Sequence, residues 1–272
     1  MSGEGARPRL VATDMDGTLL RSDLTISDRN RRAIADAHAA GITVVAATGR
    51  SWRSAVPLLA VVPEVATAVC SNGALIRDIP GETDTDVFAF PVETARQLVD
   101  AVVGAVPEAG LAWELASGEF GFDPTYARLR PAVAEQFPEH EADHPAIHDD
   151  MLKLLVHHPR LDEVALLRVL EPVVPDDVLA TYSGIDTVEI TGDGVHKAHA
   201  LAVLCARLGI DAAEVVAIGD NRNDLEMLRW AGRGVAMGNA LPATVAAADE
   251  QTAHHLEDGV ALVIESVLAA LS

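Results

Sequence analysis

Two aspartates that follow a short apolar segment are the residues in this sequence best suited to chemistry. Asp14 and Asp16 lie two positions apart, so an extended backbone points both carboxylates the same way. Two carboxylates this close repel each other, which raises the pKa of one of them unless a cation intervenes. The ionised carboxylate can attack an electrophile and form a covalent intermediate. The other can protonate a leaving group and later accept a proton from water.

A second group of oxygen-bearing side chains lies near the other end of the chain and comprises Asp220, Asn223 and Asp224. Mg²⁺ prefers hard oxygen ligands and is often held by one or two carboxylates together with phosphate and water. Such a metal ion would screen Asp14 from an incoming anion and balance charge in the transition state. Asp224 has an alternative interpretation, as a negative charge favoured at the N-terminus of a helix.

Three further side chains are suited to holding a phosphate group. Lys197 stands at the start of a predicted helix, where its ammonium can reach a phosphate oxygen, and Thr48 can donate its hydroxyl to another. Arg50 can either bind the substrate or pair with an acid. The second lysine, Lys153, falls in a predicted strand, and we interpret it as structural. A carboxylate nucleophile, a second acid, a metal, a lysine and a threonine together make a set for phosphoryl transfer.

Short, fully apolar segments precede these polar groups. The sequence predicts strands over 10–13, 42–47, 66–70, 215–218 and 234–237, and helices over 28–40, 196–208, 224–231 and 259–271. Apolar strands that alternate with helices indicate a parallel sheet buried on both faces. Because ligands bind at the carboxyl ends of such strands, we expect Asp14, Thr48 and Asp220 to converge there.

The middle of the chain follows a different pattern. Helices are predicted over 91–106 and 161–174 and strands over 152–157 and 178–182, without strict alternation. This pattern indicates an α+β insertion. We therefore predict an α/β protein with a discontinuous core, formed by residues 1–87 and 185–272, and an inserted domain over 88–184.

The composition narrows the classes of partner. The 272 residues are 49% hydrophobic and 22% charged, which indicates a folded protein with a buried core. The formal net charge of −21 repels nucleic acid and anionic lipid, so we expect neither nucleic acid nor membrane as a partner. Cys70 and Cys205 are interpreted as reduced core residues. No apolar stretch resembles a signal peptide or a membrane span, so we expect a cytoplasmic protein.

The candidate residues fall in four motifs, which are Asp14-Met15-Asp16-Gly17-Thr18-Leu19, Ala47-Thr48-Gly49-Arg50, Gly194-Val195-His196-Lys197 and Gly219-Asp220-Asn221-Arg222-Asn223-Asp224. These motifs resemble those of the haloacid dehalogenase superfamily, and within it the Cof-type (class IIB) phosphatases with a large inserted cap. Shorter matches are Ser71-Asn72-Gly73-Ala74, Gly234-Val235-Ala236-Met237-Gly238-Asn239-Ala240 and Glu257-Asp258-Gly259-Val260. The third motif departs from the usual Ser-Lys-Gly, because it continues His196-Lys197-Ala198.

The resemblance implies a Rossmann-like parallel-sheet core with an inserted α+β cap of the C2 type, which closes over the core and sets specificity. It implies that Asp14 is the phosphoryl-accepting nucleophile and that Asp16 is the general acid and base. The implied ligands of Mg²⁺ are Asp14, Asp16 through its backbone carbonyl, Asp220 and Asp224. The implied phosphate-binding residues are Thr48, Lys197 and Asn223, and the implied substrate contacts are Gly49, Arg50 and Asn72.

The resulting prediction is Mg²⁺-dependent hydrolysis of a small phosphomonoester, of the sugar-phosphate or flavin-pathway type, through an aspartyl-phosphate intermediate. Carbon–halogen displacement is disfavoured, because it has no leaving-group oxygen for Asp16 to protonate. Two alternatives stay open, a phosphomutase acting on a phosphosugar and a non-catalytic phosphosugar-binding regulator. Candidate specificity contacts on the cap are Trp113, Glu114, Tyr126 and Arg128. The oligomeric state is left open.

Overall fold

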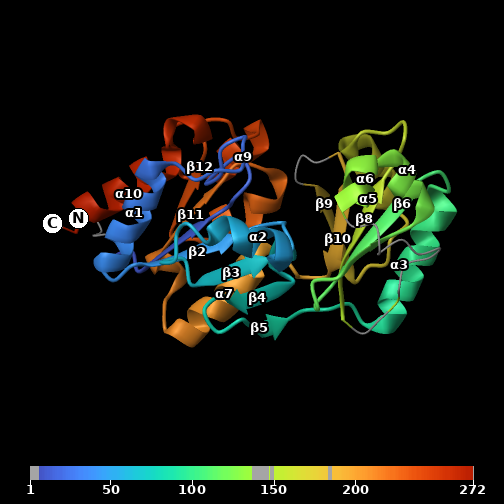
Figure 1. The fold of residues 1–272 in the computed structure, drawn as a ribbon, viewed down its shortest axis with the longest axis horizontal. Coiled ribbons are helices and arrows are strands. Elements are labelled where there is room, and N and C mark those ends of the chain that lie inside the picture. Colours follow the sequence, from blue (N-terminus) through green and yellow to red (C-terminus); the bar gives the residue numbers. More distant parts are fainter. Residues whose placement is uncertain (1–5, 137–146, 148–149, 183–185, 272) are drawn as a thin grey trace. The chain divides into compact units, whose positions relative to one another are not determined.

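The computed structural model describes residues 6–136, 147, 150–182 and 186–271 of the chain (Figure 1). The chain divides into two compact units, one formed by Met1–Asp86 and His196–Ser272 and the other by Val87–Val195. The second unit therefore continues past residue 184, where we expected the insertion to end. The cause is strand β10 (Val188–Gly192), which pairs with β8 (Met151–His157) and β9 (Val178–Tyr182).

The first unit is built on a sheet that has eight strands in the described ranges, in the order β13-β12-β11-β1-β2-β3-β4-β5. The strands are β1 (Leu10–Thr13), β2 (Thr43–Ala47), β3 (Thr67–Cys70), β4 (Leu75–Asp78), β5 (Thr83–Val87), β11 (Val215–Gly219), β12 (Arg233–Ala236) and β13 (Glu250–Gln251). Pairing is parallel from β13 to β3, as in a Rossmann-like sheet, and β4 adds to β3 in the antiparallel direction. The side chains of β1 are fully buried, because helices cover both faces of the sheet.

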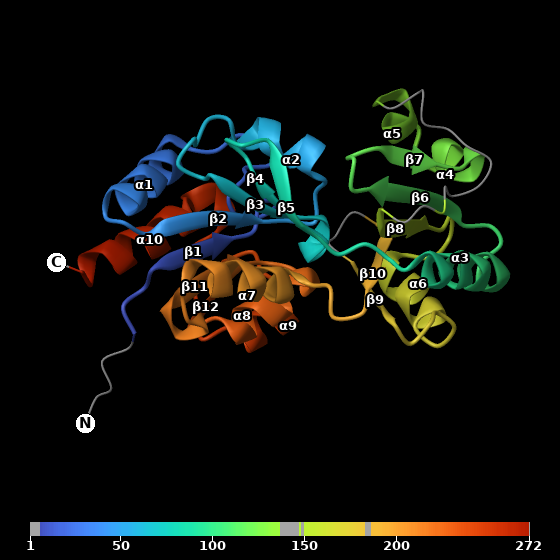
Figure 2. The same cartoon turned by 90° about the horizontal axis from the view of Figure 1, so that it is seen from below.

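Helices cover the two faces of this sheet in two groups (Figure 2). One face carries α1 (Asp28–Ala39), α2 (Trp52–Leu59) and α10 (Gly259–Ala269), and the other carries α7 (Lys197–Leu208), α8 (Leu225–Trp230) and α9 (Pro242–Ala247). Single 3₁₀ turns are η1 (Ser71–Gly73), η3 (Ala212–Glu214), η4 (Arg222–Asp224) and η5 (His255–Glu257). The expected helix over 224–231 thus begins as the 3₁₀ turn η4. Among the described residues, no helix combines the length and apolar character that a membrane span requires.

The second unit is an antiparallel sheet in the order β7-β6-β8-β10-β9, with β6 (Gly110–Leu115) and β7 (Phe120–Phe122) at one side. Helices α3 (Val92–Ala105) and α6 (Glu163–Leu170) pack on one face through an apolar cluster that includes Leu98, Trp113 and Leu154. Helices α4 (Pro124–Leu129) and α5 (Pro131–Gln136) lie on the other face, where Phe122 and Tyr126 form a smaller cluster. This α+β arrangement agrees with the one expected for the insertion.

Candidate active site

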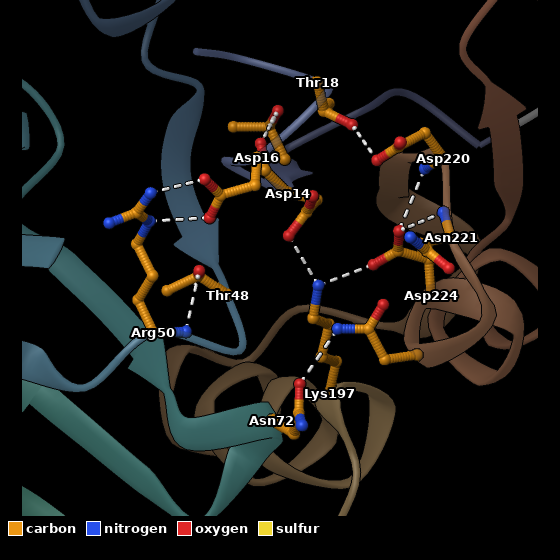
Figure 3. Close-up of polar contacts among 12 residues, drawn as sticks. Asp14, Asp16, Thr18, Thr48, Arg50, Asn72, Lys197, Asp220, Asn221 and Asp224 are labelled. Atoms are coloured by element: carbon orange, nitrogen blue, oxygen red, sulfur yellow. Dashed lines mark hydrogen bonds and ion pairs between the residues drawn. The ribbon is translucent and has the colours of Figure 1, made fainter. Parts of the chain in front are cut away.

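The carboxyl ends of three neighbouring strands bring the sequence-predicted residues together (Figure 3). Asp14 directly follows β1, Thr48 follows β2 and Asp220 follows β11. Strand β1 pairs with both β2 and β11, so the three strand ends lie side by side. Lys197 approaches from the first residue of α7 and points its ammonium between Asp14 and Asp224.

Lys197 is a fully buried cation held by two carboxylates. Its Nζ donates to Oδ1 of Asp14 and to Oδ1 of Asp224, each at 2.6 Å. Burial alone would lower the pKa of this ammonium, but the negative charges of Asp14 and Asp224 raise it above its ordinary value. Lys197 therefore remains protonated in the folded protein.

Asp14 is also buried, with 5% of the residue exposed. Burial raises its pKa, and the neighbouring charges of Asp224 and Asp220 raise it further, whereas Lys197 offsets only part of the shift. A nucleophilic carboxylate has to be ionised to attack. The surroundings of Asp14 consequently favour a second cation besides Lys197.

Three carboxylates are placed to hold such a cation. Oxygen atoms of Asp14, Asp220 and Asp224 all lie within 4.8 Å of one another. Burial, followed by the charge of Asp224, raises the pKa of Asp220 to about 6. Lys197 neutralises one of the three negative charges, and the oxygen donors are of the hard type that divalent cations prefer. The residues present therefore fit a divalent metal site.

Two side chains hold Asp220 in place by hydrogen bonds. The Thr18 hydroxyl donates to its Oδ1 at 3.0 Å, and the Asn239 amide donates to its Oδ2 at 3.3 Å and to the Gly17 carbonyl at 2.8 Å. Gly17 has a φ of 75°, and a Cβ there would lie 2.5 Å from Oδ2 of Asp220, so the close approach requires glycine. We did not predict a role for Asn239 from the sequence. It lies in the loop that follows β12, so the rule that ligands bind at the carboxyl ends of strands would have pointed to it.

Asp224 has a different environment from the other two carboxylates. Its Oδ2 accepts the backbone N–H groups of Asp220 at 2.9 Å and Asn221 at 3.0 Å, while its Oδ1 binds Lys197. The side chain is fully buried. Asp224 therefore fixes Lys197 and the loop after β11, and direct ligation of a metal by this residue stays a prediction.

Asp16, the expected general acid and base, pairs with an arginine. Arg50 donates from Nε to Oδ2 and from Nη2 to Oδ1 of Asp16, both at 2.6 Å. The Asp16 side chain is 48% exposed, unlike that of Asp14. Of the two interpretations of Arg50 from the sequence, the structure shows pairing with an acid.

The remaining predicted residues form a connected group beside Lys197. Thr48 Oγ1 accepts the backbone N–H of Arg50 at 3.1 Å. Asn223 donates its side-chain amide to Oδ1 of Asn72 at 2.9 Å. Gly49 lies against the same oxygen, since a Cβ on Gly49 would approach it to 2.9 Å. The structure thus brings every predicted site residue to one edge of the sheet.

The departure in the third motif has a local explanation. His196 occupies the N-cap position of α7, and its Nδ1 accepts the backbone N–H of His199 at 3.2 Å. A serine at this position would cap the helix in the same way through its hydroxyl. Ala198 is 3% exposed and fits within the first turn of α7. The replacement therefore preserves the helix start that orients Lys197.

The candidate specificity contacts of the second unit are not equivalent. Trp113 and Tyr126 are each 2% exposed and belong to its two apolar clusters, which indicates a packing role. Glu114 is buried and lies 3.6 Å from Nζ of Lys153, which is 3.4 Å from Glu189. Lys153 therefore balances buried charge within this sheet. Arg128 is exposed on α4.

Comparison with known proteins gives concordant matches over most of the chain. A family model described as haloacid dehalogenase-like hydrolase matches residues 11–264. A 5-amino-6-(5-phospho-D-ribitylamino)uracil phosphatase of Bacillus subtilis is 31% identical, over 94% of this chain and 94% of that protein. An HMP-PP phosphatase of an Enterobacter species is 29% identical, over 88% of this chain and 87% of that protein.

Solved structures show the same fold. A haloacid dehalogenase-like hydrolase from Bacteroides thetaiotaomicron superposes with a TM-score of 0.78 and 27% identity, covering 96% of this chain and 99% of that one. A protein from Streptococcus mutans superposes with a TM-score of 0.83 at 23% identity, covering 96% of this chain and 99% of that chain. The similarity therefore extends over both the parallel-sheet unit and the inserted α+β unit.

Proposed function

The chain belongs to the haloacid dehalogenase-like hydrolase family, and we propose that this phosphatase hydrolyses a small phosphomonoester with Mg²⁺ as cofactor and Asp14 as nucleophile. The observation that carries the proposal is the position of Asp14 at the end of β1. There it is bonded to the buried ammonium of Lys197 and lies within 4.8 Å of Asp220 and Asp224.

The first step transfers the phosphoryl group to the protein. A carboxylate oxygen of Asp14 attacks phosphorus, and the bond from phosphorus to the leaving alcohol oxygen breaks as the new O–P bond forms. Asp16 gives its proton to that leaving oxygen. Lys197, Thr48 and Asn223 bind the phosphoryl oxygens while charge moves between donor and acceptor.

The second step releases phosphate. Asp16, now ionised, accepts a proton from a water molecule, whose oxygen attacks phosphorus and displaces Asp14. The Asp14 carboxylate is regenerated and inorganic phosphate leaves. The half-exposed position of Asp16 suits this role, because a proton shuttle has to reach both the leaving group and water.

Asp14, Asp220 and the backbone of Asp16 would hold Mg²⁺, with Asp224 supporting them. When bound, the ion supplies positive charge that offsets the repulsion between these carboxylates and the phosphoryl oxygens. Magnesium suits this set, since it is commonly bound by one or two carboxylates together with substrate phosphate.

The substrate is a small phosphorylated metabolite of the sugar-phosphate or flavin-pathway type. One relative acts on a phosphate carried by a ribitylamino group and another on HMP-PP, so relatives of similar identity to this chain differ in substrate. These two relatives have nearly the same sequence identity to this chain. We therefore propose for this chain only the class of substrate, a small phosphorylated metabolite, and not either relative's own substrate.

A panel of phosphomonoesters tests the proposal. Purified protein with Mg²⁺ should release inorganic phosphate from a generic aryl phosphate and faster from at least one sugar or ribityl phosphate, and Asp14→Asn should release none. Phosphorus NMR of the products separates the alternatives: a phosphomutase yields a phosphorylated isomer, and a regulator binds without turnover. No phosphate release from any member of the panel would contradict the proposal.

A further inference from the structure

The turn that follows β3 has an unusual backbone. Ser71, Asn72 and Gly73 have φ values of 52°, 58° and 100°, so three successive residues lie in the left-handed region. Non-glycine residues in this region cost about 1–3 kcal/mol each and persist where their surroundings hold them. Ser71 and Asn72 are 1% and 2% exposed, so this strained turn is enclosed within the first unit.

Backbone hydrogen bonds join the turn to the loop after β2. The N–H of Ser71 donates to the Arg50 carbonyl at 2.9 Å, and the N–H of Asn72 donates to the Thr48 carbonyl at 3.0 Å. The position of Thr48, the predicted phosphate contact, is therefore coupled to the turn.

The same turn lies directly against the start of α7. A Cβ on Gly73 would lie 2.4 Å from the carbonyl oxygen of His196 and 3.1 Å from the backbone nitrogen of Lys197. This spacing leaves no room for a side chain and requires glycine at Gly73. The first turn of α7, which carries Lys197, is therefore in close contact with the backbone of the turn at Gly73.

The side chain of Asn72 reaches the third loop. Its Oδ1 accepts a hydrogen bond from Nδ2 of Asn223 at 2.9 Å, and Asn223 is 7% exposed. A carboxamide NH₂ group is planar, so binding one of its N–H bonds to Asn72 fixes the direction of the other. The amide of Asn223 is thereby oriented by Asn72.

We propose that Asn72 is a positioning residue for phosphate binding, which orients Asn223 through its side chain and holds the loop of Thr48 through its backbone N–H. It acts without touching the substrate, in contrast to the direct contact that the sequence resemblance implied. The inference rests on the proposed function, because it assigns Asn223 to the phosphate group.

Substitution of Asn72 by glycine tests the inference, since glycine accommodates the left-handed backbone and removes the side chain that bonds Asn223. With Mg²⁺ and a generic aryl phosphate, Asn72→Gly should lower kcat/KM about ten-fold, the effect of one buried hydrogen bond. The loss should appear mainly in KM, and the affinity for inorganic phosphate, measured by calorimetric titration, should fall by a similar factor.

A double-mutant cycle separates positioning from general destabilisation. In an Asn223→Ala background, Asn72→Gly should change kcat/KM and phosphate affinity by less than about two-fold, because the group that it orients is gone. The control is Asn30→Ala, which removes another buried amide, bonded to the backbone of Ala261 and Leu19. It should lower Tm and leave phosphate affinity unchanged.

Several outcomes would overturn the inference. Full additivity of Asn72→Gly and Asn223→Ala would show independent action, and a loss of Tm with unchanged phosphate affinity would leave Asn72 a purely structural role. The phosphate titration needs no turnover. A wild-type protein that binds phosphate without hydrolysing any ester would therefore contradict the proposed function and still test Asn72. A wild type that binds no phosphate would contradict both.

Discussion

The ammonium of Lys197 lies 2.6 Å from Oδ1 of Asp14, with 0% and 7% of the two side chains exposed. This buried ion pair connects the end of β1 to the start of α7, two segments far apart in the sequence. Asp224 binds the same ammonium at 2.6 Å, so two carboxylates share one cation. The pair therefore orients the proposed nucleophile and leaves negative charge that a metal ion can balance.

Lys197→Met should remove both activity and much of the stability. The substitution leaves Asp14, Asp220 and Asp224 without a cation, and breaking a buried pair costs about 3–5 kcal/mol. Urea denaturation with and without Mg²⁺ measures the loss, and the metal should restore part of it. Lys153→Met is the matched control, because Lys153 is also a buried lysine between two carboxylates. This control should destabilise the protein yet retain phosphate release, and equal loss of activity in both variants would contradict the prediction.

Asp14→Asn should abolish turnover and preserve the fold. The neutral amide cannot attack phosphorus, so kcat should fall by several orders of magnitude. Lys197 then faces the charges of Asp224 and Asp220, one negative charge fewer than in the wild type, so Tm should stay the same or rise. Phosphate-release assays and thermal unfolding measure the two effects. Near-normal activity would assign the nucleophile elsewhere.

The strands around the site could be predicted because their sequences are apolar throughout. The expected strand over 10–13 has the same bounds as β1. Strands β6 and β10 of the second unit escaped prediction because they contain Glu114 and Glu189, whose charges interrupt the apolar pattern. Both carboxylates are nevertheless buried, since Lys153 on the strand between them lies close to each. Strand β8, which carries Lys153, was predicted nonetheless, because the residues on both sides of the lysine are apolar.

For the site, the rule that ligands bind at strand ends placed Asp14, Thr48 and Asp220 together correctly. The hydrogen bonds and ion pairs within the site could not be predicted from the sequence, because they join side chains from different loops. Arg50 had two open interpretations, and its contact with Asp16 depends on how the loop after β2 leaves the sheet. The link from Asn72 to Asn223 likewise depends on three successive left-handed residues, and although Asn-Gly favours a turn, it does not say which side chain the turn will meet.

Divalent metal should stabilise the protein through the carboxylate group. A ligand at 100 times its Kd stabilises the folded state by about 2.7 kcal/mol. Tm measured in millimolar Mg²⁺ should therefore be higher than Tm measured in EDTA. EDTA should also abolish phosphate release. Asp220→Ala should abolish the shift. Unchanged activity in excess EDTA would remove the metal from the mechanism.

The stability of the metal-free protein should fall as the pH rises from about 4 to 6. The pKa of Asp220 is raised in the folded state to about 6 from 3.8, by burial and then by the charge of Asp224. A raised pKa means that the folded state binds the proton more tightly than the unfolded state. The stability contributed by protonated Asp220 is therefore complete below pH about 4 and is lost as the pH passes about 6.

Urea denaturation in EDTA across this range measures the effect, which should be on the order of 3 kcal/mol. Asp220→Asn keeps the shape of the side chain and cannot ionise, so the difference between wild type and variant isolates this group. An identical pH dependence in the two proteins would show that Asp220 does not titrate in this window.

Substitutions at Arg50 decide between its two roles in catalysis. If Arg50 orients Asp16, as their two 2.6 Å hydrogen bonds indicate, Arg50→Gln should lower kcat with little change in KM. Loss of this orientation should cost about 10- to 100-fold in kcat, and Arg50→Lys, which keeps the charge, should recover part of it.

Asp16→Asn should lower kcat by about 10²–10⁴-fold, the usual contribution of general acid–base catalysis. In the Asp16→Asn background Arg50→Gln should then have little further effect. A rise in KM at constant kcat would instead make Arg50 a direct substrate contact.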